Sequence, residues 1–206
     1  ELGHGLLDEV AAVGVEVESG GERFTVEGDQ IVVSSGAIGS PHLLLLSGVG
    51  PAPQLRSVGV DVRHDLPGVG QNLRDHPSAV VLLRVAGEKP DVQAPAIQVG
   101  LRYTVEGSYL RNDMQMTPIL MTSEHRPVQV VIADDDNYLG LSCSLQLALG
   151  AGELRLTSAD PHVQPLLDYN YLTNPFDRER MRQAIRLAVR LAGDPTFKDL
   201  VIERVL

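Results

Sequence analysis

The alternation of apolar and polar residues predicts a β-hairpin near the start of the chain, followed by a buried strand. Val13–Val17 and Phe24–Val26 are short β-type runs on either side of the turn signal Ser19-Gly20-Gly21. Ile31–Ser34 is a compact apolar run bounded by small residues, a pattern typical of a strand covered on both faces.

Short helices are expected next. Ser40 offers an N-cap oxygen, and Pro41 needs no N–H donor, so the pattern predicts a helix that begins here and ends before Gly48. Pro51–Val58 predicts a second short helix. The Gly- and Pro-rich residues 66–77 then predict a loop.

Beyond Pro77 the pattern changes to a succession of strand-like segments. These are Ala79–Val85, Ile97–Thr104, Met114–Met121, Val128–Ala133, Leu141–Leu149 and Glu153–Leu156. Several extended segments in a row favour an antiparallel sheet over further βαβ units. The fold class expected is therefore α+β.

A long amphipathic helix is predicted near the C-terminus. Asn174 is a favourable N-cap and Pro175 suits the first helical position. Apolar residues follow helical spacing along one face, while Arg182, Arg186 and Arg190 line another. The arginine row is either a solvated helix face or an anion-binding stripe.

Composition narrows the functional classes. The 206 residues carry a formal net charge of −10, which argues against a nucleic-acid or anionic-membrane partner. No apolar run is long enough to span a membrane, and the first residues do not resemble a signal peptide. The single cysteine, Cys143, excludes an internal disulfide and is either a strand residue or a redox thiol. We expect a cytoplasmic protein.

Several chemical motifs are absent from these 206 residues. Gly140–Ser144 lacks the second glycine of a hydrolase nucleophile elbow, and Asp134–Asp136 lacks the offsets of an EF-hand. The six histidines show no metal-ligand spacing, so no metal site is expected. No Gly-x-Gly-x-x-Gly turn follows a strand, so the sequence has no dinucleotide fingerprint.

Four other segments carry a specific pattern. Gly36–Gly50 runs from a small-residue turn through Ser-Pro into an apolar helix that ends Ser-Gly-Val-Gly. Asp65–Pro77 reads Asp-Leu-Pro-Gly-Val-Gly-Gln-Asn-Leu-Arg-Asp-His-Pro, and Gly152–Pro161 and Asp168–Leu172 follow in order. Together these segments resemble the glucose-methanol-choline (GMC) oxidoreductases, and the resemblance covers nearly the whole chain from about Val13.

The resemblance implies a two-part organisation. Residues 1–77 would be a partial FAD-binding segment that contains the hairpin, the buried strand, the signature helix and the Asp-His-Pro loop. Residues 78–206 would be a substrate-binding domain with an antiparallel sheet and the C-terminal helix. Family members oxidise an alcohol by hydride transfer to FAD, so FAD and a small-molecule alcohol are the expected cofactor and substrate.

The resemblance also implies the site residues. The expected cofactor-binding residues are Ser35, Gly36, Ala37, Gly39, Ser40, Asn72, Asp75 and His76. Small residues let a backbone approach a flat ligand, although close helix–strand packing would use the same residues. His76 beside Asp75 is either a base or, as we favour, part of a hydrogen-bonded structural loop.

The family's pyrophosphate-binding turn and catalytic histidine have no counterpart in these residues. No catalytic residue is therefore assigned, and the chain alone is expected to be inactive. It is either a piece of an FAD-dependent alcohol oxidoreductase or a non-catalytic binding or scaffolding module. A partial domain should expose apolar surface, which predicts self-association.

Overall fold

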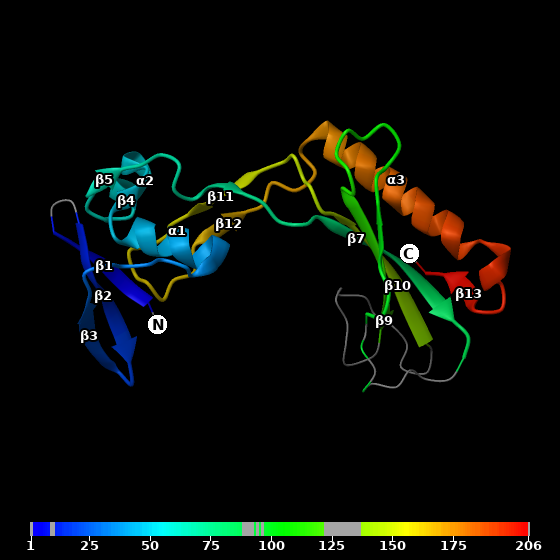
Figure 1. The fold of residues 1–206 in the computed structure, drawn as a ribbon, viewed down its shortest axis with the longest axis horizontal. Coiled ribbons are helices and arrows are strands. Elements are labelled where there is room, and N and C mark those ends of the chain that lie inside the picture. The colour runs from blue at the N-terminus through cyan, green and yellow to red at the C-terminus, as the bar shows by residue number, and fades with distance from the viewer. Residues whose placement is uncertain are drawn as a thin grey trace. The chain divides into compact units, whose positions relative to one another are not determined.

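The computed structural model describes residues 2–8, 11–87, 93, 95, 97–121 and 137–205, of which 2–8 are described by their backbone alone. The chain forms two compact units (Figure 1). The first comprises Glu1–Arg74 and Ala151–Asn170, and the second comprises Asp75–Gly150 and Tyr171–Leu206.

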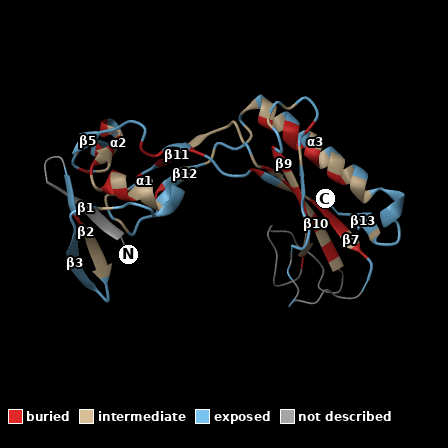
Figure 2. Ribbon diagram, viewed as in Figure 1, coloured by how far each residue is buried: buried red, intermediate tan, exposed pale blue. Residues whose placement is uncertain are grey.

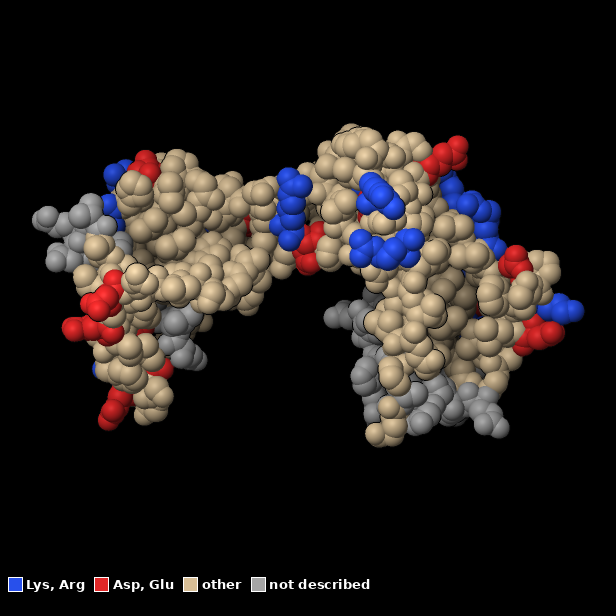
Figure 3. Space-filling model, in the orientation of Figure 1, with Lys and Arg blue, Asp and Glu red and all other residues tan. Residues whose placement is uncertain are grey.

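The first unit begins with an antiparallel sheet in the order β1-β2-β3, whose strands are Leu2–Asp8, Ala11–Ser19 and Glu22–Glu27. Gly20 and Gly21 turn between β2 and β3 with positive φ, which confirms the predicted hairpin. All of β3 is exposed, as the pale blue in Figure 2 shows. Acidic side chains gather over this hairpin (Figure 3).

The predicted buried strand at Ile31–Ser34 is wrong. These residues form neither helix nor strand, and Val32 is 83% exposed. Among the described residues no strand lies beside this segment to pair with its backbone. An apolar run becomes a buried strand only where a neighbouring strand and a covering layer exist.

The first helix, α1, spans Gly36–Leu46 and starts earlier than predicted. Ser35 is its N-cap and Pro41 lies inside it. Proline in the second turn forfeits its own backbone hydrogen bond. The Ser40 hydroxyl, however, accepts a hydrogen bond from the Ser35 N–H at 3.0 Å, which ties down the start of the helix. Gly48 follows the helix with φ of +85°, as predicted.

The rest of the first unit packs around α1. β4 (Val49–Gly50) pairs in parallel with β5 (His64–Asp65). Between them in the chain lies α2 (Ala52–Ser57), the second short helix that the sequence predicts. β6 (Gln71–Leu73), β11 (Gly152–Arg155) and β12 (Leu166–Asp168) form an antiparallel sheet in the order β12-β11-β6. The buried core of the unit is Leu45, Leu46, Leu55, Val60, Val69, Leu154 and Leu156.

The pairing of β11 with β6 divides the chain into domains differently from the sequence-based prediction. The sequence placed residues 78–206 in one domain, whereas Ala151–Asn170 folds with the first unit. The reason is that β11 pairs with β6, and Leu154 is buried among side chains from α1 and α2. The first boundary lies at Arg74, close to the one predicted.

The second unit is built on a five-stranded antiparallel sheet in the order β13-β7-β10-β9-β8. Its strands are β7 (Ser78–Val85), β8 (Leu101–Tyr103), β9 (Met114–Met121), β10 (Asn137–Leu145) and β13 (Val201–Arg204). The α+β class with an antiparallel sheet is confirmed.

Some strands of this sheet begin and end at other residues than the local sequence pattern predicts. β9 matches its prediction residue for residue, and β8 is shorter than predicted. The strand expected at Leu141–Leu149 is β10, which ends at Leu145 because the next residues turn toward Asp177. The segment expected at Val128–Ala133 lies outside the described residues.

The C-terminal helix α3 spans Pro175–Ala192 and packs on one face of this sheet (Figure 1). The Asn174 side chain accepts from the N–H of Phe176 at 2.8 Å, which confirms the predicted N-cap. Met181, Ala184 and Ala188 are buried against the sheet. A short 3-10 turn, η1 (Pro195–Phe197), then leads into β13. No helix in the described parts of the chain is long and apolar enough to cross a membrane.

A buried ion cluster connects α3 to the loops above the sheet. Arg180 is 1% exposed, and its guanidinium donates to the carboxylates of Asp113 and Asp177, both fully buried. Asp177 also accepts from the N–H groups of Leu149 and Gly150. The cluster therefore holds the end of β10 against the start of α3.

Candidate functional site

The N-terminus of α1 brings together five of the eight expected cofactor-binding residues: Ser35, Gly36, Ala37, Gly39 and Ser40. Gly36 has φ of +80°, and the space where its Cβ would stand is open. The first turn contains no acidic residue, and the Ser35 side chain does not cap it. The first backbone N–H groups of a helix lack intrahelical acceptors and carry partial positive charge. This terminus therefore fits an anionic or carbonyl group.

Asn72 lies elsewhere in the first unit, in β6. It has φ of +61°, and its side-chain oxygen accepts from Arg74 Nε at 3.0 Å. No described contact joins Asn72 to the α1 terminus. Asp75 and His76 belong to the second unit, so the structure distributes the eight residues over both units.

Asp75 and His76 form a hydrogen-bonded loop just before β7. Asp75 accepts from the His76 N–H at 2.7 Å and from the Tyr171 hydroxyl at 2.9 Å. The His76 backbone bond, followed by the Tyr171 bond, lowers the pKa of the Asp75 carboxyl. The imidazole Nδ1 of His76 lies 3.0 Å from the Leu145 carbonyl oxygen. These contacts support the structural interpretation of the pair.

That contact also decides which nitrogen of His76 carries the proton. A carbonyl oxygen only accepts, so Nδ1 must donate to Leu145 and the neutral ring has its lone pair on Nε2. The ring is thus oriented by backbone and has one nitrogen able to accept a hydrogen bond or a proton. This chemistry is available to His76 beside its structural role.

The sheet of the second unit has two different faces. The face toward α3 is apolar and includes Val81, Leu83, Met116, Cys143 and Leu145. Because neighbouring residues alternate between faces, their sequence neighbours point the other way. We call this second side the open face; it is buried at one end, around Leu82, Met121 and Tyr138, and accessible at the end near Ser78.

A row of polar residues crosses the open face. Arg102 of β8 stands opposite Gln115 of β9, Gln115 opposite Ser144 of β10, and Ser144 opposite Ser78 of β7. The hydroxyls of Ser78 and Ser144 are 2.6 Å apart. The row ends beside His76, because the Ser78 hydroxyl donates to the His76 carbonyl.

The polar row was not predicted from the sequence, although the sequence contains a pattern that indicates it. Polar residues alternate with apolar ones at Gln115 and Thr117, and again at Ser142 and Ser144. The alternation defines two faces, but only the tertiary structure shows which of them packs against α3. Hydroxyls and amides in such a row can orient a small polar molecule by hydrogen bonds.

Other expected features have simpler roles. Cys143 is fully buried, and burial raises the pKa of its thiol to about 11, so it is a strand residue rather than a redox thiol. Arg182, Arg186 and Arg190 are exposed along α3, as a solvated face predicts. The described part of the chain contains no group of three or more His, Cys, Asp or Glu side chains that could hold a metal ion.

Comparison with known proteins decides the family. Two family models described as GMC oxidoreductase match the chain, the N-terminal one over residues 6–78 and the C-terminal one over residues 149–204. The chain belongs to the GMC oxidoreductase family. Enzymes of this family use FAD and oxidise alcohols.

Curated GMC relatives match nearly the whole chain. The oxygen-dependent choline dehydrogenase of Sinorhizobium medicae is 29% identical over 214 residues, which cover 93% of this chain and 39% of the relative. The chloroplastic fatty acid photodecarboxylase of Chlamydomonas reinhardtii is 30% identical over 225 residues, which cover 89% of this chain and 37% of the relative. The chain thus spans about 39% of the length of the first of these relatives.

Solved GMC structures share the fold. The formate oxidase of Aspergillus oryzae aligns with a TM-score of 0.85 at 23% identity, and the alignment covers 99% of this chain and 44% of the oxidase chain. Pyridoxine 4-oxidase from Mesorbium loti aligns with a TM-score of 0.85 at 22% identity. At this identity the likeness concerns the fold alone.

Proposed function

We propose that this chain forms part of an FAD-dependent alcohol oxidoreductase and supplies a cofactor-contacting helix terminus and a substrate-facing sheet. The observation that carries the proposal is the polar row on the open face, which ends beside His76 in a chain of the GMC family. α3 covers the opposite face, whereas Ser78 is exposed and Gln115 and Ser144 are half-buried, so a ligand can reach this row.

The α1 terminus is the part of the chain that fits the cofactor. The backbone N–H groups of Gly36 and Ala37 would donate to an acceptor on FAD, and the absence of a Cβ at Gly36 permits close approach. When bound, FAD supplies the acceptor for a hydride from the alcohol carbon. Asn72, Asp75 and His76 stay expected cofactor contacts.

The residues of the open face would orient the alcohol. Ser144 and Gln115 offer both donors and acceptors to a substrate hydroxyl. His76 would be held by the Leu145 carbonyl through Nδ1, which leaves Nε2 as the nitrogen able to accept from a substrate hydroxyl. We further propose that the isolated chain does not turn over, because it contains no Gly-x-Gly-x-x-Gly turn to hold the pyrophosphate.

FAD titration of the purified chain tests the cofactor part of this proposal. Ala37→Asp places a negative charge in the first turn of α1, which should repel an anionic cofactor group, whereas Ala37→Asn adds similar bulk without charge. We expect weak FAD binding by the parent and by Ala37→Asn, and a loss of at least tenfold in Ala37→Asp. Equal binding by all three proteins would place FAD elsewhere on the chain.

A turnover assay distinguishes a catalytic chain from a non-catalytic binding or scaffolding module. With added FAD, a dye acceptor and a panel of primary and secondary alcohols, we expect no dye reduction by the isolated chain. Sustained reduction that is lost in His76→Gln would make the chain a complete enzyme with His76 as its base. A protein that binds neither FAD nor alcohols would instead be a non-catalytic scaffolding module.

A further inference from the structure

The polar row on the open face ends in a charged side chain at β8. Arg102 stands opposite Gln115, and its guanidinium donates to the Asn112 carbonyl at 3.1 Å. Asn112 lies just before β9, so this contact turns the guanidinium toward the edge of the sheet where β9 begins. Arg102 is exposed, and within the described ranges it has no ion-pair partner. Its positive charge is therefore available to a ligand on this face.

His76 lies at the same edge of the sheet. It precedes the start of β7, and its Nδ1 contacts the carbonyl oxygen of Leu145, where β10 ends. β8 and β10 are two places apart in the sheet, with Gln115 of β9 between them. At a strand spacing of about 4.8 Å, the His76 imidazole is therefore roughly 10 Å from the strand that carries Arg102.

The other charges on the described part of the open face do not compete with Arg102. Arg84 and Glu203 form an ion pair with each other at 2.8 Å, toward the far end of β7. Asp75 lies beside His76, at the opposite end of the row, and its carboxylate already accepts two hydrogen bonds. The polar row thus offers a positive charge at one end and the imidazole at the other.

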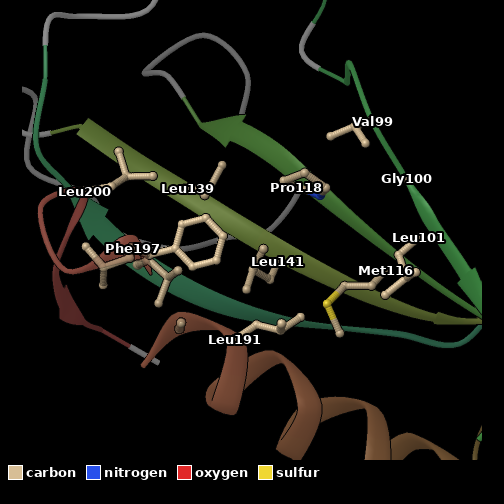
Figure 4. Close-up of a pocket in the computed structure, with 13 residues that line it drawn as sticks. Val99, Gly100, Leu101, Met116, Pro118, Leu139, Leu141, Leu191, Phe197 and Leu200 are labelled. Carbon is tan, nitrogen blue, oxygen red and sulfur yellow. The ribbon is translucent and has the colours of Figure 1, made fainter. Parts of the chain in front are cut away.

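The α3 side of the same sheet has nothing to offer a charged group. It carries a groove lined by apolar side chains and Gly100 (Figure 4). Met116, Pro118, Leu139 and Leu141 of β9 and β10 lie along it. Burial of an ion without a partner is costly, so we expect a charged substrate group on the open face and not in this groove.

We propose that Arg102 selects the substrate by binding a carboxylate at the end of the alcohol remote from its hydroxyl. The inference rests on the proposed function, in which the open face receives the alcohol. With the hydroxyl at Ser144 and His76, a carboxylate roughly 10 Å away meets the guanidinium, which presents paired N–H donors to such a group. One guanidinium balances one negative charge, which favours a carboxylate over a doubly charged phosphate. The substrate class is a hydroxy acid of that length.

NMR titration of the isotope-labelled chain tests the charge preference with probes of equal length. The probes are the anionic ω-hydroxyoctanoate, the neutral octane-α,ω-diol and the cationic ω-aminooctanol, and binding is followed at the backbone amide signals of Gln115 and Ser144. We expect the hydroxy acid to bind about fivefold more tightly than the diol, and the amino alcohol more weakly than the diol. Added salt should reduce the preference, because it screens exposed charges.

Variants assign the preference to Arg102. In Arg102→Met the affinity for ω-hydroxyoctanoate should fall to that for the diol, while the diol binds as it does to the parent. Arg102→Lys should restore part of the preference, since an ammonium keeps the charge but lacks the planar fork. Arg190→Met is the matched control: Arg190 is also exposed but belongs to α3, on the opposite face, so this variant should bind all probes as the parent does. Circular dichroism confirms that each variant folds.

Failure of this inference and failure of the proposed function give different results. If the hydroxy acid and the diol shift the signals of the row with equal affinity, or if Arg102→Met keeps the preference, the open face receives alcohols but Arg102 does not select among them. If no probe shifts the signals of Gln115 and Ser144, the open face is not a substrate surface, and the proposed function fails as well.

Discussion

At the scale of single residues, the environment of Asp75 makes a prediction about pH. Hydrogen bonds from the His76 N–H and the Tyr171 hydroxyl lower the pKa of its carboxyl. A depressed folded pKa contributes stability above the unfolded pKa of about 3.9, and this contribution is lost as pH falls through the folded value.

Asp75→Asn should therefore be less stable than the parent at neutral pH, by about 0.5 kcal/mol after allowance for solvent screening. The difference should shrink toward zero in acid below the pKa of Asp75. Urea unfolding of both proteins at neutral and acid pH measures it. A difference that persists unchanged in acid would mean that the charge of Asp75 contributes nothing.

At Gly152 the neighbouring strand leaves no room for a side chain. A Cβ there would overlap the Asp168 carbonyl oxygen in the paired strand β12. Backbone cannot yield as a flexible side chain does, so Gly152→Ala should cost more than about 2 kcal/mol. Gly68→Ala, where a Cβ meets no atom within 4 Å, should change stability by less than about 1 kcal/mol. Urea unfolding distinguishes the two, and equal effects would contradict the described pairing of β11 with β12.

At the scale of elements, the buried Arg180 holds α3 to the loops of the sheet. Arg180→Met leaves the carboxylates of Asp113 and Asp177 buried without their cation, a change that costs about 3–5 kcal/mol. Arg182→Met is the control, since Arg182 is 57% exposed and lies 3.5 Å from Glu179 on the helix surface. Its effect should stay below about 1 kcal/mol. Denaturant midpoints of both variants check the contrast.

At the scale of the whole molecule, each core lies within one unit. The cluster around Leu45 and Leu154 belongs to the first unit, and the cluster around Leu83 and Met181 belongs to the second. Stability can therefore be lost in one unit before the other. In Arg180→Met, hydrogen exchange should accelerate in β7, β9 and β10, while β11 and β12 keep the protection of the parent. Uniform acceleration would show that the two units unfold together.

The sequence by itself determined the features whose hydrogen bonds close within a few residues. Gly20 and Gly21 make the hairpin turn, Asn174 caps α3, and the β9 segment reads as a strand from its own composition. The motif segments likewise identified the GMC family and the small-residue turn at Gly36. Each of these depends on local backbone chemistry, which neighbours in sequence dictate.

Only the tertiary structure decided which segments meet and which faces are covered. Ile31–Ser34 has the apolar pattern of a buried strand, yet Val32 is exposed because burial requires a neighbour that the pattern does not encode. Residues 151–170 join the first unit because β11 meets β6 about eighty residues earlier in the chain. Likewise the polar row from Arg102 to Ser78 forms only because three strand registers align it. Such contacts join residues far apart in sequence, and the free energy that selects them comes from packing rather than from local propensity.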